Sequence, residues 1–299
     1  MKASKHFKGK KTGVSYCMMA PWMLLFLLFT ILPVFAAVGL SFTDFNLLES
    51  PEWIGLSNYF RLFLEDDVFI IALKNTLILA VITGPVGYIL SFVIAWMIND
   101  LSRRASSFLT LLFYVPTMAG NVYFIWKFIF SGDSYGLLNS LLMRIGIITE
   151  PIYWLTDSKI NLYACIIVVL WMSMGAGFLA MIAGFKGLNI SLFEAGALDG
   201  IRNRWQELWY ITLPQMVPQL LIGAVLSISS AFAVGYQCKE LTGFPSTDYS
   251  THTVVLHILD YSNNRYEMGY ACAISVVLFI IMVVAWRFID GKLRKFGAD

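Results

Sequence analysis

The sequence predicts an all-α, polytopic membrane protein with six transmembrane helices, because its composition is strongly apolar and its charges fall in short segments. Of the 299 residues, 58% are hydrophobic and only 13% are charged, whereas soluble domains carry about 25% charged residues. So few charges cannot cover a surface that faces water. The composition therefore excludes a disordered chain, a nucleic-acid-binding protein and a disulfide-stabilised scaffold.

Six stretches of spanning length lack aspartate, glutamate, lysine and arginine, whose placement at mid-bilayer is costly. A helix needs about 20 apolar residues to cross the hydrocarbon core. Each stretch must be helical, because an isolated strand would leave backbone groups unsatisfied in lipid. We expect a single transmembrane domain over residues 1–299, with spans near residues 15–40, 75–99, 106–130, 160–184, 210–236 and 267–288.

The first span follows five lysines in the first eleven residues and could be mistaken for a signal peptide. Its apolar stretch, Tyr16–Leu40, is much longer than the roughly 7–15 residues of a signal-peptide core. We therefore interpret it as an uncleaved first helix.

The basic residues predict that both termini are cytoplasmic. With the N-terminus inside, 14 of the 21 lysine and arginine residues fall on the cytoplasmic side, as the positive-inside rule requires. The same orientation makes residues 186–210 a cytoplasmic loop between the fourth and fifth spans.

The charge-free stretches contain no titratable group of the kind that ion-coupled carriers need near mid-bilayer. The sequence also lacks a Ser/His/Asp set, paired carboxylates, an HExxH motif and a phosphate-binding loop. If the protein moves a solute uphill, another polypeptide must supply the energy. A docking element should then face the cytoplasm.

The four cysteines give no sign of a shared role. Cys17, Cys165, Cys238 and Cys272 form neither a CxxC pair nor a metal-binding spacing. We interpret them as inert small side chains.

The cytoplasmic loop contains the most informative pattern of the chain. Ser191-Leu-Phe-Glu194 is typical of a capping box, in which the serine caps the helix and the glutamate bonds back to the cap. Gly200 suits a left-handed helix end. The pattern predicts a helix of about two turns, which is either a plain connector or a docking element that leaves a Glu194 oxygen for a partner's arginine.

A family resemblance rests on this loop. Glu194-Ala195-Gly196, Asp199-Gly200 and Ile211-Thr212-Leu213-Pro214 resemble the EAA loop of bacterial ABC importer permeases. The details are similar to the carbohydrate uptake branch, the maltose and glycerol-phosphate type, and the resemblance covers nearly the whole chain. The sequence departs from the pattern at Gly196 and Ile201, where alanine is usual. The stretch from Gly200 to Leu213 is one residue longer than in the commonest form of the pattern. These departures leave the contacts of Arg202 to Trp205 open.

The resemblance implies a type I ABC importer permease fold in the bacterial inner, or plasma, membrane. It implies that two permeases, usually different chains, pair around one pathway for a sugar or oligosaccharide, and that a periplasmic or extracellular binding protein delivers the solute. Two ATPase subunits would bind ATP and magnesium, so this chain would be no enzyme and would hold no cofactor or metal. The residues that would dock the ATPase are Glu194, Ala195, Gly196, Asp199 and Gly200.

By the same resemblance, the solute pathway is built mainly from the third, fourth and fifth spans. Serines in membrane helices usually bond to their own backbone, and aromatic residues usually mark the membrane interface, so each candidate also has an ordinary structural interpretation. The candidates for contact with solute are Tyr114, Asn121, Tyr123, Trp171, Ser173, Ser227, Ser229 and Ser230.

Three other functions stay open. The chain could be an importer permease for another solute, such as a peptide or a sugar acid. It could be a secondary carrier or channel that needs no nucleotide, although the charge-free spans argue against this. A membrane-bound enzyme is poorly supported, because no catalytic set of residues is present.

Overall fold

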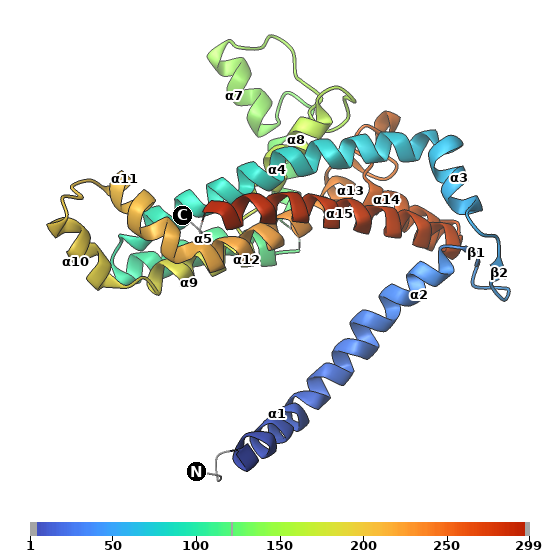
Figure 1. The fold of residues 1–299 in the computed structure, drawn as a ribbon. Helices are drawn as coiled ribbons and strands as arrows, with labels where there is room; N and C mark the ends of the chain where they lie inside the picture. Colours follow the sequence, from blue (N-terminus) through green and yellow to red (C-terminus); the bar gives the residue numbers. More distant parts are fainter. Residues whose placement is uncertain (1–4, 121, 297–299) are drawn as a thin grey trace. The chain divides into compact units, whose positions relative to one another are not determined.

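The computed structural model describes residues 5–120 and 122–296, and nearly all its regular structure is helical, which confirms the all-α prediction (Figure 1). Five helices are long and apolar enough to cross a membrane, and a bent pair of helices makes up to six. Internal contacts divide the chain into two compact units. The first unit comprises residues up to Glu65 together with Ile258–Val277, and the second comprises Asp66–His257 together with the residues from Leu278 onward.

The first unit begins with a long apolar helical segment. Helix α1 (Lys5–Phe26) continues through a π-helical stretch, Leu27–Ile31, into α2 (Leu32–Leu40). Pro33 stands at the start of α2, where its missing N–H cannot donate to the preceding turn. The part from Ser15 to Leu40 has high hydropathy, and no residue of its most apolar window is buried inside the protein. This exposure is expected for a helix that faces lipid or another membrane subunit.

A short β-hairpin and a helix follow this segment within the first unit. Strands β1 (Thr43–Asp44) and β2 (Glu52–Trp53) pair antiparallel, and α3 (Ser57–Leu64) comes next. The buried amide of Asn58 donates to the carbonyls of Ser41 and Thr43, at 2.9 and 3.0 Å. Because these bonds satisfy buried backbone groups, they hold the hairpin to the start of α3.

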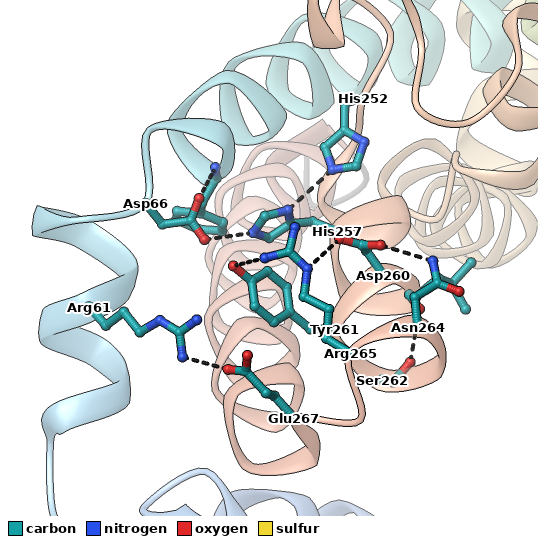
Figure 2. Close-up of polar contacts among 12 residues, drawn as sticks. Arg61, Asp66, His252, His257, Asp260, Tyr261, Ser262, Asn264, Arg265 and Glu267 are labelled. Carbon is teal, nitrogen blue, oxygen red and sulfur yellow. Dashed lines mark hydrogen bonds and ion pairs between the residues drawn. The ribbon is translucent and has the colours of Figure 1, made fainter. Parts of the chain in front are cut away.

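Arg61 on α3 connects the two sequence segments of the first unit. Its guanidinium donates to Glu267 at 2.5 Å (Figure 2) and lies 4.3 Å from the ring centre of Tyr270. On the second segment, Arg265 bonds Asp260 at 2.9 Å and lies 4.3 Å from the centre of the Tyr261 ring. Alternating charges and aromatic faces thus stabilise this surface.

The second unit is built around α4 (Asp67–Asn99), which packs against α9 (Ala176–Lys186) and α12 (Leu213–Phe232). The helix begins eight residues before the predicted span at residue 75. Asp66 caps it by accepting the Phe69 amide at 2.9 Å, an interaction that suits a helix N-terminus. The extra turns hold Asp67 and Lys74, so a search for charge-free residues could not include them.

Two predicted spans are interrupted. The third consists of α5 (Arg103–Met118) and α6 (Tyr123–Ile129), which meet at 89°. The fourth consists of α8 (Asn161–Trp171) and α9, with a break at residues 172–175. Pro116 and Gly175 lie close to these breaks, and both residue types weaken a continuous helix. Hydropathy alone does not register such breaks.

The remaining short helices lie in loops at the two ends of the spans. They are α7 (Leu137–Ile145), α10 (Ile190–Leu198), α11 (Arg204–Glu207), α13 (Tyr236–Thr242) and α14 (Val254–Leu259). A π-helical stretch, Leu208–Thr212, joins α11 to α12, and α15 (Met268–Phe296) ends the described chain.

A buried polar chain ties the start of α4 to the loop before α14. The imidazole of His257 lies between Asp66, at 3.0 Å, and His252, at 3.2 Å (Figure 2). The amide of Asn75 donates to the carbonyls of Tyr249 and His252, each at 3.0 Å. Since both histidines are almost fully buried, these bonds fix the loop against α4.

Asn139 on α7 organises the loop between α6 and α8. Its side chain is fully buried and bonds the carbonyls of Ser131, Asp133 and Ile152, the Ile152 amide and the Trp154 indole, at 2.8–3.2 Å. Asn139→Ala would leave these groups unsatisfied, at about 1–3 kcal/mol for each buried one. We expect faster hydrogen exchange across residues 131–155.

The neighbouring variant Ser140→Ala is the control for this prediction, because the Ser140 hydroxyl bonds the Leu137 carbonyl of its own helix. Equal exchange rates in the two variants would contradict the organising role of Asn139.

Candidate functional site

A cavity of about 130 Å³ lies between α4, α8, α9 and α12, within the second unit. It has room for several water molecules. Its walls are formed by hydroxyls, one amide, small residues and apolar side chains, and none of its described lining residues is charged. The polar lining residues are Thr83, Tyr88, Ser91, Ser173, Ser227, Ser230 and Gln237.

The break between α8 and α9 brings a hydroxyl into this cavity. Ser173 lies in the break, and a side chain at Gly87 of α4 would come within 2.8 Å of the Ser173 β-carbon. The two segments therefore touch through a glycine. Among the described residues, the buried Ser173 hydroxyl has no hydrogen-bond partner, so it has an unused donor and acceptor in the cavity wall.

Two of the other serines of the cavity already have protein partners. Ser227 donates to the carbonyl of Gly84 on α4 at 3.0 Å, and Ser230 donates to Leu226 on its own helix at 2.8 Å. Each hydroxyl keeps acceptor capacity after donating its proton. These two hydroxyls therefore offer acceptors to a solute that is rich in hydroxyl donors, whereas the Ser173 hydroxyl can both donate and accept.

Three of the predicted pathway residues, Ser173, Ser227 and Ser230, thus line one cavity. The aromatic candidates lie elsewhere. Tyr123 packs edge-on against Tyr236 with ring centres 5.8 Å apart, and Trp171 packs against Trp126 at 5.3 Å.

Of the other candidates, Tyr114 accepts the Thr117 hydroxyl with its backbone carbonyl on α5 and is not part of the cavity wall. Ser229 is exposed and is likewise not part of that wall. Asn121 lies outside the described residues.

Sequence reasoning missed the contribution of α4. Thr83, Gly87 and Ser91 recur at intervals of four residues, so they share one helix face. This stripe of small and polar residues in an apolar span was the available signal. Gln237 of α13 could not be found this way, because it follows the end of the fifth span.

The second part of the candidate site is the cytoplasmic helix α10, whose cap differs from the prediction. Asn189, not Ser191, is the N-cap, and its side chain accepts the Ser191 amide at 3.1 Å. The predicted capping box is therefore wrong. Asn189 competes successfully because a short amide side chain caps a helix as well as serine does. In the described chain Glu194 makes no such bond, and its side chain stays exposed.

The C-terminal end of α10 agrees with the prediction. Gly200 has φ +97°, and the Ile201 amide bonds the Gly196 carbonyl at 2.9 Å. This is the Schellman arrangement, which satisfies the last carbonyls of a helix. The helix therefore has defined ends, and Ala195, Asp199 and Gly200 are exposed together with Glu194.

The two departures from the EAA pattern contact each other. A β-carbon at Gly196 would lie 3.1 Å from the Cδ1 atom of Ile201 and 2.7 Å from that of Ile211. Gly196 is buried beneath these side chains. Isoleucine at position 201 is larger than the usual alanine, and it occupies space that glycine, which is smaller than the usual alanine, leaves at position 196.

We expect Gly196→Ala to destabilise the loop less in an Ile201→Ala background than in the wild type. Overpacking costs about 1–3 kcal/mol, and contacting residues couple by about 0.5–3 kcal/mol. Unfolding temperatures of the four detergent-solubilised variants measure this coupling. Strict additivity of the two changes would contradict it.

The stretch after Gly200, which is one residue longer than in the common EAA pattern, contacts α4. Arg204 forms an ion pair with Asp100 at the end of α4, and Trp205 packs against Trp96 with ring centres 5.2 Å apart. Asn203 caps α11 by accepting the Gln206 amide at 2.8 Å. These contacts give the residues after α10 a fixed connection to the membrane helices.

Three comparisons relate this arrangement to known proteins. The model of the family described as "Binding-protein-dependent transport system inner membrane component" matches residues 87–294. The probable ABC transporter permease protein YesP of Bacillus subtilis is 31% identical over 94% of this chain and 90% of that protein. The lactose transport system permease protein LacF of Rhizobium radiobacter is 29% identical over 89% of this chain and 88% of that protein.

The fold also matches a solved structure. A chain of a bacterial ABC transporter involved in the import of the acidic polysaccharide alginate superposes with a TM-score of 0.76 at 25% identity. The match covers 98% of this chain and 99% of that one.

Proposed function

Because the chain belongs to the family of binding-protein-dependent transport system inner membrane components, we propose that it forms half of the translocation pathway of an ATP-driven sugar importer. It is a multi-pass component of the inner membrane with the type I permease fold, and it is not itself an enzyme. The solute, the docking site and the partner chains are the parts that we propose.

One observation carries the proposal: α10 is a short helix with defined ends, an exposed Glu194 and a fixed connection to α4. A rigid helix on the cytoplasmic side can transmit movement in both directions. We propose that α10 docks a separate ATPase subunit through Glu194, Ala195, Gly196, Asp199 and Gly200. ATP and magnesium bind that subunit, and its closure moves α10 and the helices attached to it.

The cavity supports a neutral sugar or oligosaccharide as solute. Its hydroxyl and amide groups match a polyol, and its apolar walls match the sugar's C–H faces. A sugar acid is the second candidate, since the alginate transporter has the same fold. However, the described cavity wall has no cation that could offset a carboxylate in a poorly hydrated site, so the neutral class is favoured.

The remaining partners are proposed from the family to which the chain belongs. This chain surrounds its cavity with α4, α8, α9 and α12, and we propose that a second, different permease chain supplies the other half of the pathway. A binding protein outside the membrane delivers the solute. A peptide importer or a proton-coupled carrier is less well supported, because the described cavity wall has no charged side chain that could pair with a peptide terminus or carry a proton.

Purification of the chain from gently solubilised membranes tests the partner assignment. We expect an ATPase and a second permease to co-purify, and Glu194→Lys to release the ATPase while the second permease stays bound. Calorimetry with the cognate binding protein then tests the solute, with a neutral oligosaccharide and its uronic-acid counterpart as the compared ligands. Selective binding of the acid would contradict the proposed solute class.

A further inference from the structure

Two of the four cysteines meet inside the second unit. Cys165 on α8 and Cys238 on α13 are close neighbours, because the two helices contact each other and both side chains are fully buried. They share one apolar cluster with Val168, Val234 and Leu256. Neither forms a disulfide in the structure, where both are free. The expectation that all four cysteines act only as inert packing does not explain this pairing.

The pair lies at the outer end of the cavity wall. Val169, four residues after Cys165 on the same helix face, lines the cavity, and so does Gln237, the neighbour of Cys238. In the orientation that the basic residues define, Cys165 lies just after one external loop and Cys238 lies at the start of the next, so both are near the outer side. Extracytoplasmic compartments favour disulfides, whereas the cytoplasm keeps thiols reduced.

We propose that Cys165 and Cys238 are a disulfide-forming site that joins α8 to α13 across the outer rim of the cavity. The oxidant is a small disulfide on the outer side of the membrane. The thiolate of one cysteine attacks it, forming a mixed disulfide and releasing one thiol. The second cysteine then attacks the mixed disulfide, so the Cys165–Cys238 bond forms, a second thiol leaves, and the protons of the two cysteines end on the two released thiols.

The bond would fix two elements that must separate if solute passes between them. Helix α13 has seven residues and contacts α6 and α8, so it is the shortest helix of this wall. Since both thiols are buried in the reduced state, the exchange requires α13 to move away from α8. Oxidation would then trap the closed arrangement, and this effect on uptake rests on the proposed function.

The chemical step can be tested without transport. Membranes that contain the full complex with Cys17→Ser and Cys272→Ser are treated with 4,4′-dithiodipyridine, and the intact chain is weighed by mass spectrometry. We expect the mass to fall by two hydrogen atoms with no pyridyl adduct. Adding Cys165→Ser or Cys238→Ser should leave one thiol, which is trapped as a single thiopyridyl adduct.

Two stable pyridyl adducts on the doubly thiol-bearing chain, or two unmodified thiols, would overturn the proposal. Uptake is measured on the same membranes and should be lost on oxidation and restored by dithiothreitol. If the disulfide forms but uptake does not change, the site exists and its link to the pathway fails. If the mass does not change, the site itself fails, whatever the uptake.

Discussion

Gly200→Val should abolish ATP-driven uptake while the chain still inserts into the membrane. At φ +97° a β-branched residue is strained by about 1–3 kcal/mol, and the bond from the Ile201 amide to the Gly196 carbonyl cannot keep its geometry. The end of α10 would unwind, and the exposed face that bears Glu194 and Asp199 would lose its fixed shape. Co-purification of the ATPase and uptake by the complex are the two measurements.

The chain offers a matched control for this variant. Gly146 ends α7 with φ +79°, and the Ile147 amide bonds the Leu142 carbonyl five residues back, as Ile201 does at α10. Gly146→Val imposes the same kind of strain outside the cytoplasmic loop. It should lower stability while ATPase co-purification persists. If Gly200→Val keeps both ATPase and uptake, α10 is only a connector.

Gly223→Leu should block uptake by a different route, with the ATPase still bound. Gly223 lies on α12 in the cavity wall. A β-carbon there would already stand 3.0 Å from the Met181 Cε and 3.5 Å from the Tyr88 ring. The further atoms of leucine would fill the cavity or push α12 from α9, at a cost of about 1–3 kcal/mol.

Ile222→Leu is the control for the cavity variant, because Ile222 is the preceding residue on α12 and is 54% exposed. It should leave uptake unchanged. ATPase activity of the purified complex separates the two routes, since Gly223→Leu should retain nucleotide hydrolysis and Gly200→Val should not retain the ATPase at all. Normal uptake by Gly223→Leu would show that solute does not pass this cavity.

The membrane fold was predictable because hydropathy reports long apolar helices directly. Charge-free stretches identified the helical segments, but they could not show where a helix extends beyond the apolar region, as α4 does before residue 75. They also could not detect a break within an apolar stretch. The interruptions after Met118 and Trp171 depend on local backbone geometry, which a count of apolar and charged residues does not report.

The candidate site was predictable only in part. The helix end at Gly200 follows from the special freedom of glycine, so the sequence indicates it. The N-cap was misassigned because Asn189 and Ser191 are both good caps and only the backbone geometry decides between them. Ser173 and Ser227 meet in one cavity through the packing of different helices, and the pairing of Cys165 with Cys238 arises in the same way. Neither arrangement can be predicted from the spacing of residues along the sequence.

Uptake into liposomes tests whether a separate ATPase powers transport through this chain. Liposomes that contain this chain, its partner permease and the ATPase are supplied with the binding protein and labelled oligosaccharide. We expect accumulation only when ATP reaches the ATPase, and none in liposomes that hold this chain alone under a proton or sodium gradient. Accumulation by the isolated chain under an ion gradient, without ATP, would contradict it.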